Sequence, residues 1–488
     1  MVGNAAYHVT GADEHGTYTL VKARKLGRPV DDVAHMHIEE ILQCLRSVDI
    51  EPDVFVRTSS EDHKDRSLAI YDQLRASGYV ELRDGEQLYC GTCEEFAADS
   101  LAVGECPACN APTDSNLCED CGSALQHNLL RNPIHTTCGQ SLILRPIRQV
   151  HFELEKFAPG LDHAIEASGW PESIKRKELD WLRSKLMALP MSRHFDRGVT
   201  LNSPVEVAGQ TLMTWFEGLW CYETGIERLC KQNGADLDDT MRNASTRLVF
   251  FMGQDNRFYY TIGVTASLFS RGYAIPYNHA IQDFYKLEGA KFSTSRDHAV
   301  WADEVAADID TNVLRYYLAS IAKPFGANDN DFLIEGLLQT AARIRAFETA
   351  LRKYAGCNET LTADELTVEQ NHNVKRYSEA VQDLRVWDAM DAIDAFFDVA
   401  SFSRADTSVS AAEVSVFLSL LNPVTPMLAA RYGAFFFGAG WRPGLDGGTI
   451  RPSTGLRKPV DFPLFSDPIP EAFIEAYERR FRQVRPNS

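Results

Sequence analysis

The start of the chain alternates short apolar runs with stretches in which apolar residues recur every three or four positions. Residues 5–10 and 53–57 predict strands, and the periodic stretches 33–47 and 65–77 predict helices. A further helix is expected from about Thr17. Strands that alternate with helices indicate an α/β sheet with crossover helices.

The same alternation returns after a break from about Leu88 to Ile147, where turn residues are frequent and periodic segments are few. We therefore expect an inserted module at the break. Beyond it, the pattern predicts helices over 171–188, 218–232 and 256–268, and strands over 205–214 and 247–252.

From about Asp329 the strand pattern disappears, and apolar residues such as Leu337, Ile344 and Leu351 fall at helical spacing. The segment Ser410–Glu413 has the sequence of a capping box that opens a helix. The last third of the chain is therefore expected to be a helical bundle.

Seven of the eleven cysteines lie between Cys90 and Cys138. They form three C-x-x-C pairs, and a histidine completes a fourth pair of the same spacing: Cys90 and Cys93, Cys106 and Cys109, Cys118 and Cys121, and His135 and Cys138. A large chain without a secretion signal favours reduced thiolates over disulfides. Eight such ligands make two closed, structural zinc sites, one of four cysteines and one of three cysteines and a histidine. A chance cluster of buried thiols is the alternative.

The composition of the 488 residues sets the broad class. Forty-nine basic against 68 acidic residues give a net charge of −19, which argues against non-specific coating of nucleic acid. The apolar runs are shorter than a membrane span requires. We expect a soluble, cytoplasmic globular protein.

Three motifs have residues suited to nucleotide chemistry. The turn Thr10–Gly16 and the turn 253–256 each follow a predicted strand, where α/β sheets place their ligands. The segment Lys291–Arg296 combines two cations with three hydroxyl residues, which suits a polyphosphate. A solvated polar loop is the alternative for each motif taken alone.

Together, in this order, these motifs resemble the methionyl-tRNA synthetase family of class I aminoacyl-tRNA ligases. Thr10–Gly16 resembles the family's TG-x-DEHG turn, and KFSTS at 291–295 stands where the family has KMSKS. The cysteine pairs resemble its two-zinc insertion, and the segment 215–222 resembles its W-x-DAP-x-GY motif. The resemblance extends over roughly residues 5–325.

The resemblance implies a class I Rossmann-like catalytic domain with a zinc-knuckle insertion, followed by an all-α bundle. The implied domains are 1–87 and 151–275 for the two parts of the catalytic domain, 88–150 for the insertion, 276–328 for the signature loop and linking region, and 329–488 for the bundle.

It also implies the reaction: activation of an amino acid by ATP with Mg²⁺ as an adenylate, and transfer to tRNA. Asp13 would hold the substrate amine, beside His15. Trp215, Tyr222 and Tyr260 would line the side-chain pocket. The other implied site residues are Gly253 and Asp255 at the adenosine, and Lys291, Ser293, Thr294 and Ser295 at the phosphates.

Four departures from the family change what we expect. The match starts downstream of the family's HIGH signature, so we expect either a clipped start or a chain that does not activate amino acids by itself. Thr294 replaces the second signature lysine, and Leu219 and Tyr260 alter the pocket. The family's anticodon-reading pattern is not found in the bundle, where the corresponding stretch reads 340–343 TAAR.

Three functional hypotheses therefore stay open. The chain is a methionyl-tRNA synthetase or near relative, or a derived ligase that passes an activated amino acid to a small-molecule or protein acceptor, or an inactive relative that keeps the fold as a binding module.

Overall fold

The computed structural model describes residues 5–114, 118, 129–184, 188–292, 298–323, 325–327, 330–355, 366–403, 410–438, 441–444 and 469–481. The chain divides into two compact units. One unit comprises residues 7–41 and 52–281, and we call it the α/β unit. The other comprises residues 1–6, 42–51 and 282–488, and we call it the helical unit.

The α/β unit begins with the predicted alternation. Its first elements are β1 (Val9–Ala12), α1 (Thr17–Leu26), α2 (Val30–Ser47, which continues into the helical unit), β2 (Val54–Arg57) and α3 (Glu61–Ala76). Strands β1 and β2 pair in parallel, with Val9 opposite Val54. Parallel pairing of consecutive strands requires a crossover, which the intervening helices provide.

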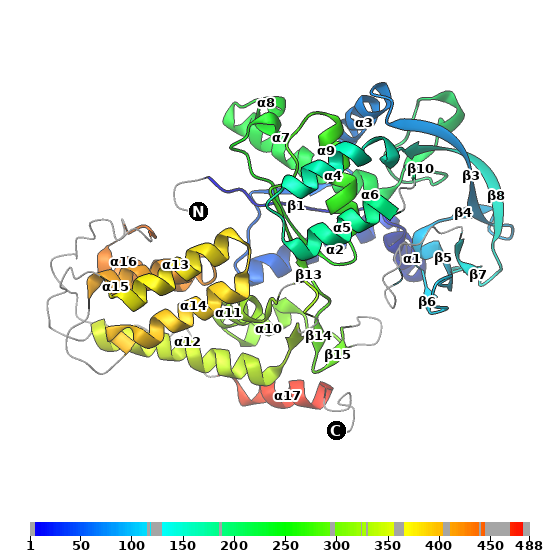
Figure 1. The fold of residues 1–488 in the computed structure, drawn as a ribbon. Helices are drawn as coiled ribbons and strands as arrows, with labels where there is room; N and C mark the ends of the chain where they lie inside the picture. The colour runs from blue at the N-terminus through cyan, green and yellow to red at the C-terminus, as the bar shows by residue number, and fades with distance from the viewer. Residues whose placement is uncertain are drawn as a thin grey trace. The chain divides into compact units, whose positions relative to one another are not determined.

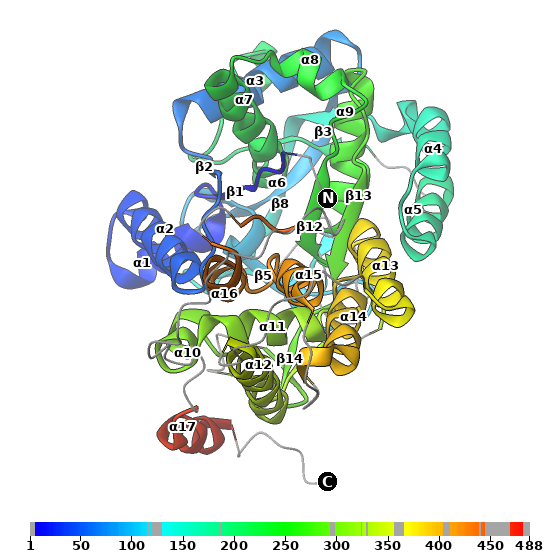
Figure 2. The ribbon, with the colours of Figure 1, turned by 90° about the vertical axis from the view of Figure 1, so that its left-hand side faces the viewer.

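Helix α7 (Cys221–Asn233) packs against both β1 and β2 (Figure 2). Its backbone comes so close to the strands that a Cβ on Gly225 would lie 2.2 Å from Cγ1 of Val9. A Cβ on Gly11 of β1 would lie 2.4 Å from the carbonyl oxygen of Val56. Glycine is therefore required at both positions by the close approach of the elements.

A long antiparallel ribbon of β3 (Val80–Cys90) and β8 (Ile143–Phe152) leads to the inserted module (Figure 1). Strands β4 (Glu95–Ala97) and β9 (Leu189–Pro190) flank the ribbon on either side. A separate three-stranded sheet follows in the order β6 (Pro112–Thr113), β5 (Ala102–Glu105) and β7 (Arg131–His135). The inserted module that the cysteine pattern predicts is therefore a small β structure at the end of the ribbon.

The rest of the α/β unit follows the predicted alternation with one exception. Its elements are α4 (Ala158–Ala167), α5 (Glu172–Ser184), β10 (Ser192–Arg193), β11 (Thr211–Leu212), α6 (Thr214–Glu217), α7, α8 (Leu237–Arg242), β12 (Val249–Gly253), the π-helix Tyr259–Val264, α9 (Thr265–Ser270) and β13 (Asn278–Gln282). The strand predicted over 205–214 is wrong except at Thr211–Leu212, which form β11. A 3₁₀ turn occupies Val205–Val207, and Gly209 adopts a φ of 84°, which breaks an extended run.

The helical unit contains a three-stranded sheet and the bundle. The sheet has the order β15 (Ala290–Lys291), β14 (Lys286–Leu287) and β16 (Asp331–Phe332). The helices are α10 (Ala302–Asp308), α11 (Thr311–Ile321), α12 (Ile334–Ala355), α13 (Val368–Gln382), α14 (Val386–Val399), α15 (Ala411–Leu421), α16 (Pro426–Phe437) and α17 (Glu471–Phe481). The predicted bundle is confirmed.

The helical periodicity of α12 becomes the core of the bundle. Leu337, Ile344 and Leu351 are all fully buried in one apolar cluster. Ser410 caps α15 as predicted and accepts hydrogen bonds from the next helical N–H groups. The predicted capping box is incomplete, because the Glu413 carboxylate accepts from Gln370 and Ser401 rather than from the N-cap backbone.

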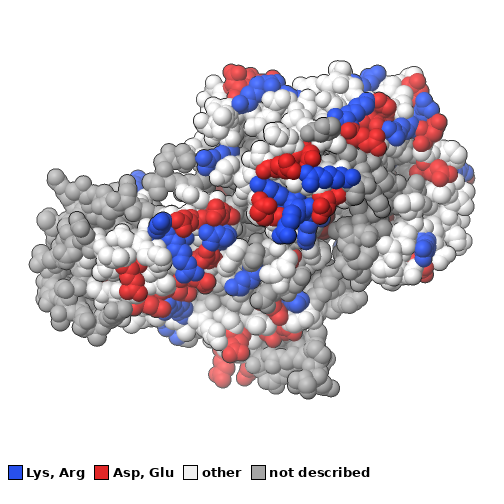
Figure 3. All heavy atoms as spheres, in the orientation of Figure 1, with Lys and Arg blue, Asp and Glu red and all other residues white. Residues whose placement is uncertain are grey.

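Charges on the face drawn in Figure 3 are mixed in sign. Over α4 and α5, for example, Arg183 pairs with both Asp162 and Glu166. Among the helices that the structure describes, none has both the length and the apolar character that a membrane crossing requires.

Candidate active site and zinc-ligand clusters

The turn after β1 carries Asp13 and His15, and a residue from α6 joins them. His15 is buried, and its Nδ1 lies 2.9 Å from Oε1 of Glu217. The other carboxylate oxygen of Glu217 accepts the N–H of Val199 at 3.0 Å. Asp13 accepts the N–H of His15 at 3.1 Å. Two carboxylates more than 200 residues apart in sequence thus both contact His15, Glu217 at the imidazole and Asp13 at the backbone N–H.

Asp13 is exposed at the surface of this turn, yet its carboxylate is crowded by protein on the inner side. This desolvation and the negative charge of Glu217 raise the pKa of Asp13 to about 6. The positive charges of His15 and Arg193 act in the opposite direction. An anionic Asp13 near neutral pH is suited to pair with an ammonium group.

Glu14, which lies between Asp13 and His15, binds this turn to the residues at the end of β2. The Glu14 carboxylate accepts from the Arg57 guanidinium and, at 2.6 Å, from the Ser59 hydroxyl. The N–H of Glu14 donates to Oγ1 of Thr58 at 2.9 Å. These hydrogen bonds hold the pKa of Glu14 below its usual range despite its burial. Glu14 is therefore used in hydrogen bonds within the protein, whereas Asp13 makes no such contact with the described residues at the end of β2.

The three predicted pocket aromatics belong to one apolar cluster. Tyr222 lies on α7, Trp215 on α6 and Tyr260 on the π-helix. Phe250 of β12 joins two of them, with ring centroids 5.0 Å from Tyr222 and 5.3 Å from Tyr260. Trp215 packs instead on Tyr259, at 4.3 Å between centroids. The structure therefore brings the predicted aromatics together in one cluster.

A buried ion pair between Glu223 and Arg271 lies next to this aromatic cluster. Glu223, on α7 next to Tyr222, is completely buried and is held by both terminal nitrogens of Arg271. The Tyr222 hydroxyl donates to the same carboxylate at 3.2 Å. Burial and the charge of Glu223 together raise the pKa of Tyr222 far above its usual range, so its hydroxyl keeps the proton that it donates.

Gly253 and Asp255 lie at the end of β12, where a ligand-binding turn was predicted. The Asp255 carboxylate folds back so closely that a Cβ on Gly253 would lie 2.5 Å from Oδ1. Lys291 ends β15 in the helical unit. Ser293, Thr294 and Ser295 lie outside the described residues, so their predicted contacts with phosphates stay predictions.

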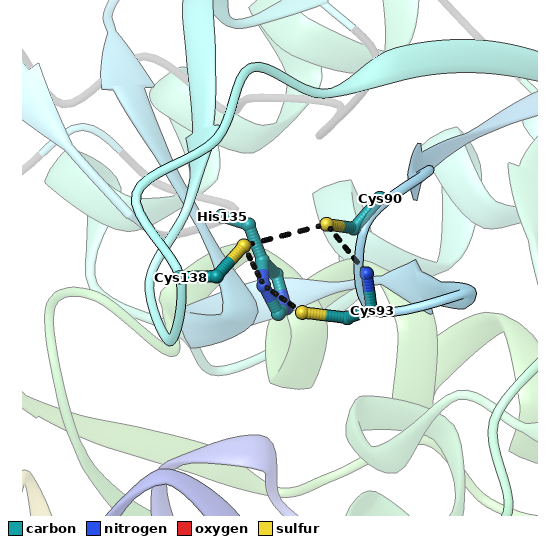
Figure 4. Close-up of side chains that lie close together, drawn as sticks. All are labelled: Cys90, Cys93, His135 and Cys138. Atoms are coloured by element: carbon teal, nitrogen blue, oxygen red, sulfur yellow. Dashed lines mark hydrogen bonds between the residues drawn. The ribbon is translucent and has the colours of Figure 1, made fainter.

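Four of the predicted metal ligands form one compact cluster (Figure 4). The ligand atoms of Cys90, Cys93, His135 and Cys138 all lie within 4.8 Å of one another. The Sγ atoms of Cys90 and Cys138 are 3.5 Å apart, and Nδ1 of His135 is 3.4 Å from Cys93 and 3.3 Å from Cys138. Tetrahedral zinc, about 2.3 Å from sulfur and 2.0 Å from nitrogen, separates its ligand atoms by roughly 3.5 Å. The set fits zinc.

Burial lowers the pKa of His135, which favours the neutral imidazole that a metal requires. The turns of the cluster also have the form expected of knuckles. The residue after each second ligand, Glu94 and Gly139, adopts a positive φ, 55° and 71° respectively. Asn110, which follows Cys109 in the other cluster, does the same at 64°.

Cys106, Cys109 and Cys118 form the second cluster, also within 4.8 Å of one another. The Sγ atoms of Cys109 and Cys118 are 3.6 Å apart. Cys121, the predicted fourth ligand, lies outside the described residues. The first and fourth pairs in sequence thus form one group, and the second and third pairs contribute to the other.

Four residues near these sites were missed by the sequence reasoning. Glu217, Phe250, Arg271 and Arg193 come from separate elements and have no mutual spacing in sequence. Of these four residues, only Glu217 could have been suspected from the sequence, because it lies inside the tryptophan-rich segment 215–222. The others become visible only once the elements are packed.

Comparison with known proteins agrees with this geometry. The family described as tRNA synthetases class I (M) matches residues 1–343. A methionine–tRNA ligase of Caldivirga maquilingensis is 33% identical over 326 residues, which is 65% of this chain and 56% of that protein. One of Methanobrevibacter smithii is 29% identical over 334 residues, 68% of this chain and 50% of that protein.

A solved structure shares the fold over most of the chain. The Mycobacterium tuberculosis methionyl-tRNA synthetase bound by methionyl-adenylate superposes with a TM-score of 0.68, at 17% identity, over 93% of this chain and 91% of that one. The predicted class I catalytic fold with a helical tail is confirmed by this likeness. The chain spans about half the length of the curated relatives described above. By its match over residues 1–343, this chain belongs to the class I (M) family of tRNA synthetases.

Proposed function

We propose that this chain is an ATP-dependent ligase that activates methionine, or an amino acid of similar shape, as its adenylate and transfers it to tRNA. The amino-acid carboxylate attacks the α-phosphorus of ATP, and the bond to pyrophosphate breaks. A ribose hydroxyl of tRNA then attacks the carbonyl carbon, and AMP leaves. Such a reaction requires positioning and charge stabilisation rather than a covalent enzyme intermediate.

The observation that carries the proposal is the closeness of Asp13 to the aromatic cluster within one compact unit. Cys221 directly precedes Tyr222, and its Sγ lies 2.8 Å from the place of a Cβ on Gly11, two residues before Asp13. The charge of Asp13 contributes to the raised pKa of the Cys221 thiol. An anion for an amine beside an apolar, aromatic pocket is what an α-amino acid with a thioether side chain needs.

The remaining residues have roles that follow from the family resemblance. Asp13 and His15 would bind the substrate, Asp13 at its amine. Trp215, Tyr222 and Tyr260 would enclose the side chain. Gly253 and Asp255 would contact the adenosine of ATP. Lys291, with Ser293, Thr294 and Ser295, would bind the phosphates with Mg²⁺.

Zinc fits the two cysteine clusters as a structural ion. Every ligand position in the first cluster is filled by protein, which leaves no open position for substrate. The metal would therefore stabilise the inserted module without taking part in the chemistry. We expect two zinc ions for each chain, since Cys121 would complete the second set.

ATP–pyrophosphate exchange measured with each of the twenty amino acids tests the proposal. We expect exchange that depends on methionine or a similar apolar amino acid, and its loss in Asp13→Asn. The control Asp84→Asn changes an exposed carboxylate on the ribbon and should keep the parent rate. Exchange with none of the amino acids would contradict the proposal.

A second assay addresses the acceptor. Transfer of the labelled amino acid to tRNA is expected if the proposal is right. Exchange without any charging of tRNA would instead support the alternative ligase, which uses a small-molecule or protein acceptor.

A further inference from the structure

The imidazole of His135 has a second nitrogen that points away from the cysteine cluster. Nδ1 faces the sulfurs of Cys93 and Cys138, whereas Nε2 makes no hydrogen bond to the described residues and has Oε1 of Glu95 as a neighbour at 3.4 Å. His135 is completely buried, so Nε2 cannot exchange this neighbour for bulk water. A histidine that binds metal through one nitrogen requires the other to be protonated, and a carboxylate is a suitable acceptor for that proton.

Glu95 is itself held in place by a residue outside the inserted module. Arg24, in the last turn of α1, forms two parallel hydrogen bonds to its carboxylate, at 2.9 and 2.7 Å. A third hydrogen bond, at 3.2 Å, joins Arg24 to the hydroxyl of Thr137, which lies between His135 and Cys138. A two-pronged guanidinium–carboxylate pair fixes direction as well as distance.

The other end of α1 is attached to the same module. The first residue of the helix, Thr17, is buried and accepts hydrogen bonds from the N–H and hydroxyl of Ser100, at 3.0 and 2.9 Å. The carbonyl of Ser100 accepts the hydroxyl of Thr136 at 2.6 Å. Helix α1 is therefore bonded to the inserted module at both of its ends, to Ser100 at its start and to Glu95 and Thr137 near its end.

From this geometry we propose that Glu95 and Arg24 are positioning residues for the metal cluster of Cys90, Cys93, His135 and Cys138. When the metal is bound, Glu95 accepts a hydrogen bond from the Nε2–H group of His135 and so fixes the imidazole with Nδ1 toward the metal. Arg24 holds Glu95 in that orientation. The inference concerns metal retention alone and stands or falls independently of amino-acid activation.

Zinc release from the purified, zinc-loaded protein to a chromophoric chelator tests the proposal. We expect Glu95→Ala and Arg24→Met to release one of the two ions about 10–100-fold faster than the parent, the range typical for loss of such an outer partner. Release of the second ion should keep the parent rate. The matched controls Asp84→Ala and Arg148→Met break an exposed ion pair on the ribbon and should release both ions at parent rates.

The variant Glu95→Gln tests whether Glu95 orients His135 or only supports the local structure. Its amide oxygen can still accept a hydrogen bond from Nε2 of His135, whereas Glu95→Ala has no acceptor. We expect the release rate of Glu95→Gln to lie close to the parent's, and the ¹⁵N-labelled His135 to keep its protonated Nε2 resonance. In Glu95→Ala that resonance should shift or exchange with water. Parent-like zinc release in Glu95→Ala, or equal acceleration in Glu95→Ala and Glu95→Gln, would overturn the proposal.

Discussion

The inserted module and the aromatic cluster behind Asp13 are built in opposite ways. In the module, the ligands come in pairs three residues apart, and its strands are only two to five residues long beyond the ribbon. In the aromatic cluster, the partners are distant in sequence: Glu223 pairs with Arg271, and His15 with Glu217. In our proposal one region depends on a metal ion for its structure, whereas the other depends on buried polar contacts between distant residues, of which the pair of Glu223 and Arg271 is an ion pair.

Removal of the metal should give the largest difference in stability between the two regions. Structural zinc contributes on the order of 10 kcal/mol to the folding of small modules. We expect a strong chelator to abolish protection of the backbone amides in β5–β7 against hydrogen exchange. The amides of α7 and β12 should keep theirs. Equal loss of protection in both regions would show that the module and the aromatic cluster unfold as one.

Loss of one ion-pair partner should affect the aromatic cluster next most strongly. Arg271→Met leaves the Glu223 carboxylate fully buried without its cation, which typically costs about 3–5 kcal/mol. Urea denaturation would measure the loss. Arg183→Met, in which an exposed arginine loses two acidic partners, should lower the free energy of unfolding far less, because solvent screens exposed ion pairs. Similar losses in the two variants would contradict the structural role of the buried pair.

Substitution of Asp13 should affect function with little effect on either region's stability. A charged hydrogen bond contributes about 1.5–3 kcal/mol, so Asp13→Asn should lower kcat/KM for amino-acid activation by roughly 10- to 150-fold. Its urea midpoint should not fall below that of the parent protein, since Asn still accepts the N–H of His15 and removes a carboxylate whose charge is disfavoured by desolvation. A large loss of stability with unchanged KM would assign Asp13 to the fold instead.

The smallest effect expected is a dependence on pH. Because desolvation and Glu217 raise the pKa of Asp13 to about 6, a fall in pH through 6 protonates the carboxylate and removes the charge that would bind an amine. The KM for the amino acid should therefore rise about tenfold between pH 7.5 and pH 5.

The control for this pH dependence is Glu217→Gln. Its single amide oxygen can still accept the N–H of Val199, its NH2 group faces Nδ1 of His15, and a negative charge is removed, so the KM midpoint should move to lower pH. His15 and Arg193, which also act on Asp13, are unchanged in that variant. An unmoved midpoint would show that another group controls the titration.

The contrast between local ligand pairs and contacts between distant residues also explains which features could be predicted from the sequence. The cysteine pairs, the α12 core residues and most helices follow from local spacing, which the sequence displays directly. Glu217 and Arg271 could not be predicted, because their partners lie far away in the chain and only packing brings them together. The strand predicted over 205–214 failed at Gly209, whose positive φ is set by the local turn rather than by the apolar pattern.

The close packing of α7 on β1 and β2 also fixes the distance between the residues at their ends. Gly225 and Gly11 leave no room between these elements for even a methyl group, so the helix cannot slide along the strands. Asp13 follows the end of β1, and Tyr222 stands near the start of α7. If Asp13 binds the amine and Tyr222 lines the pocket, as we propose, the fixed distance between them would select substrate side chains by their length before activation.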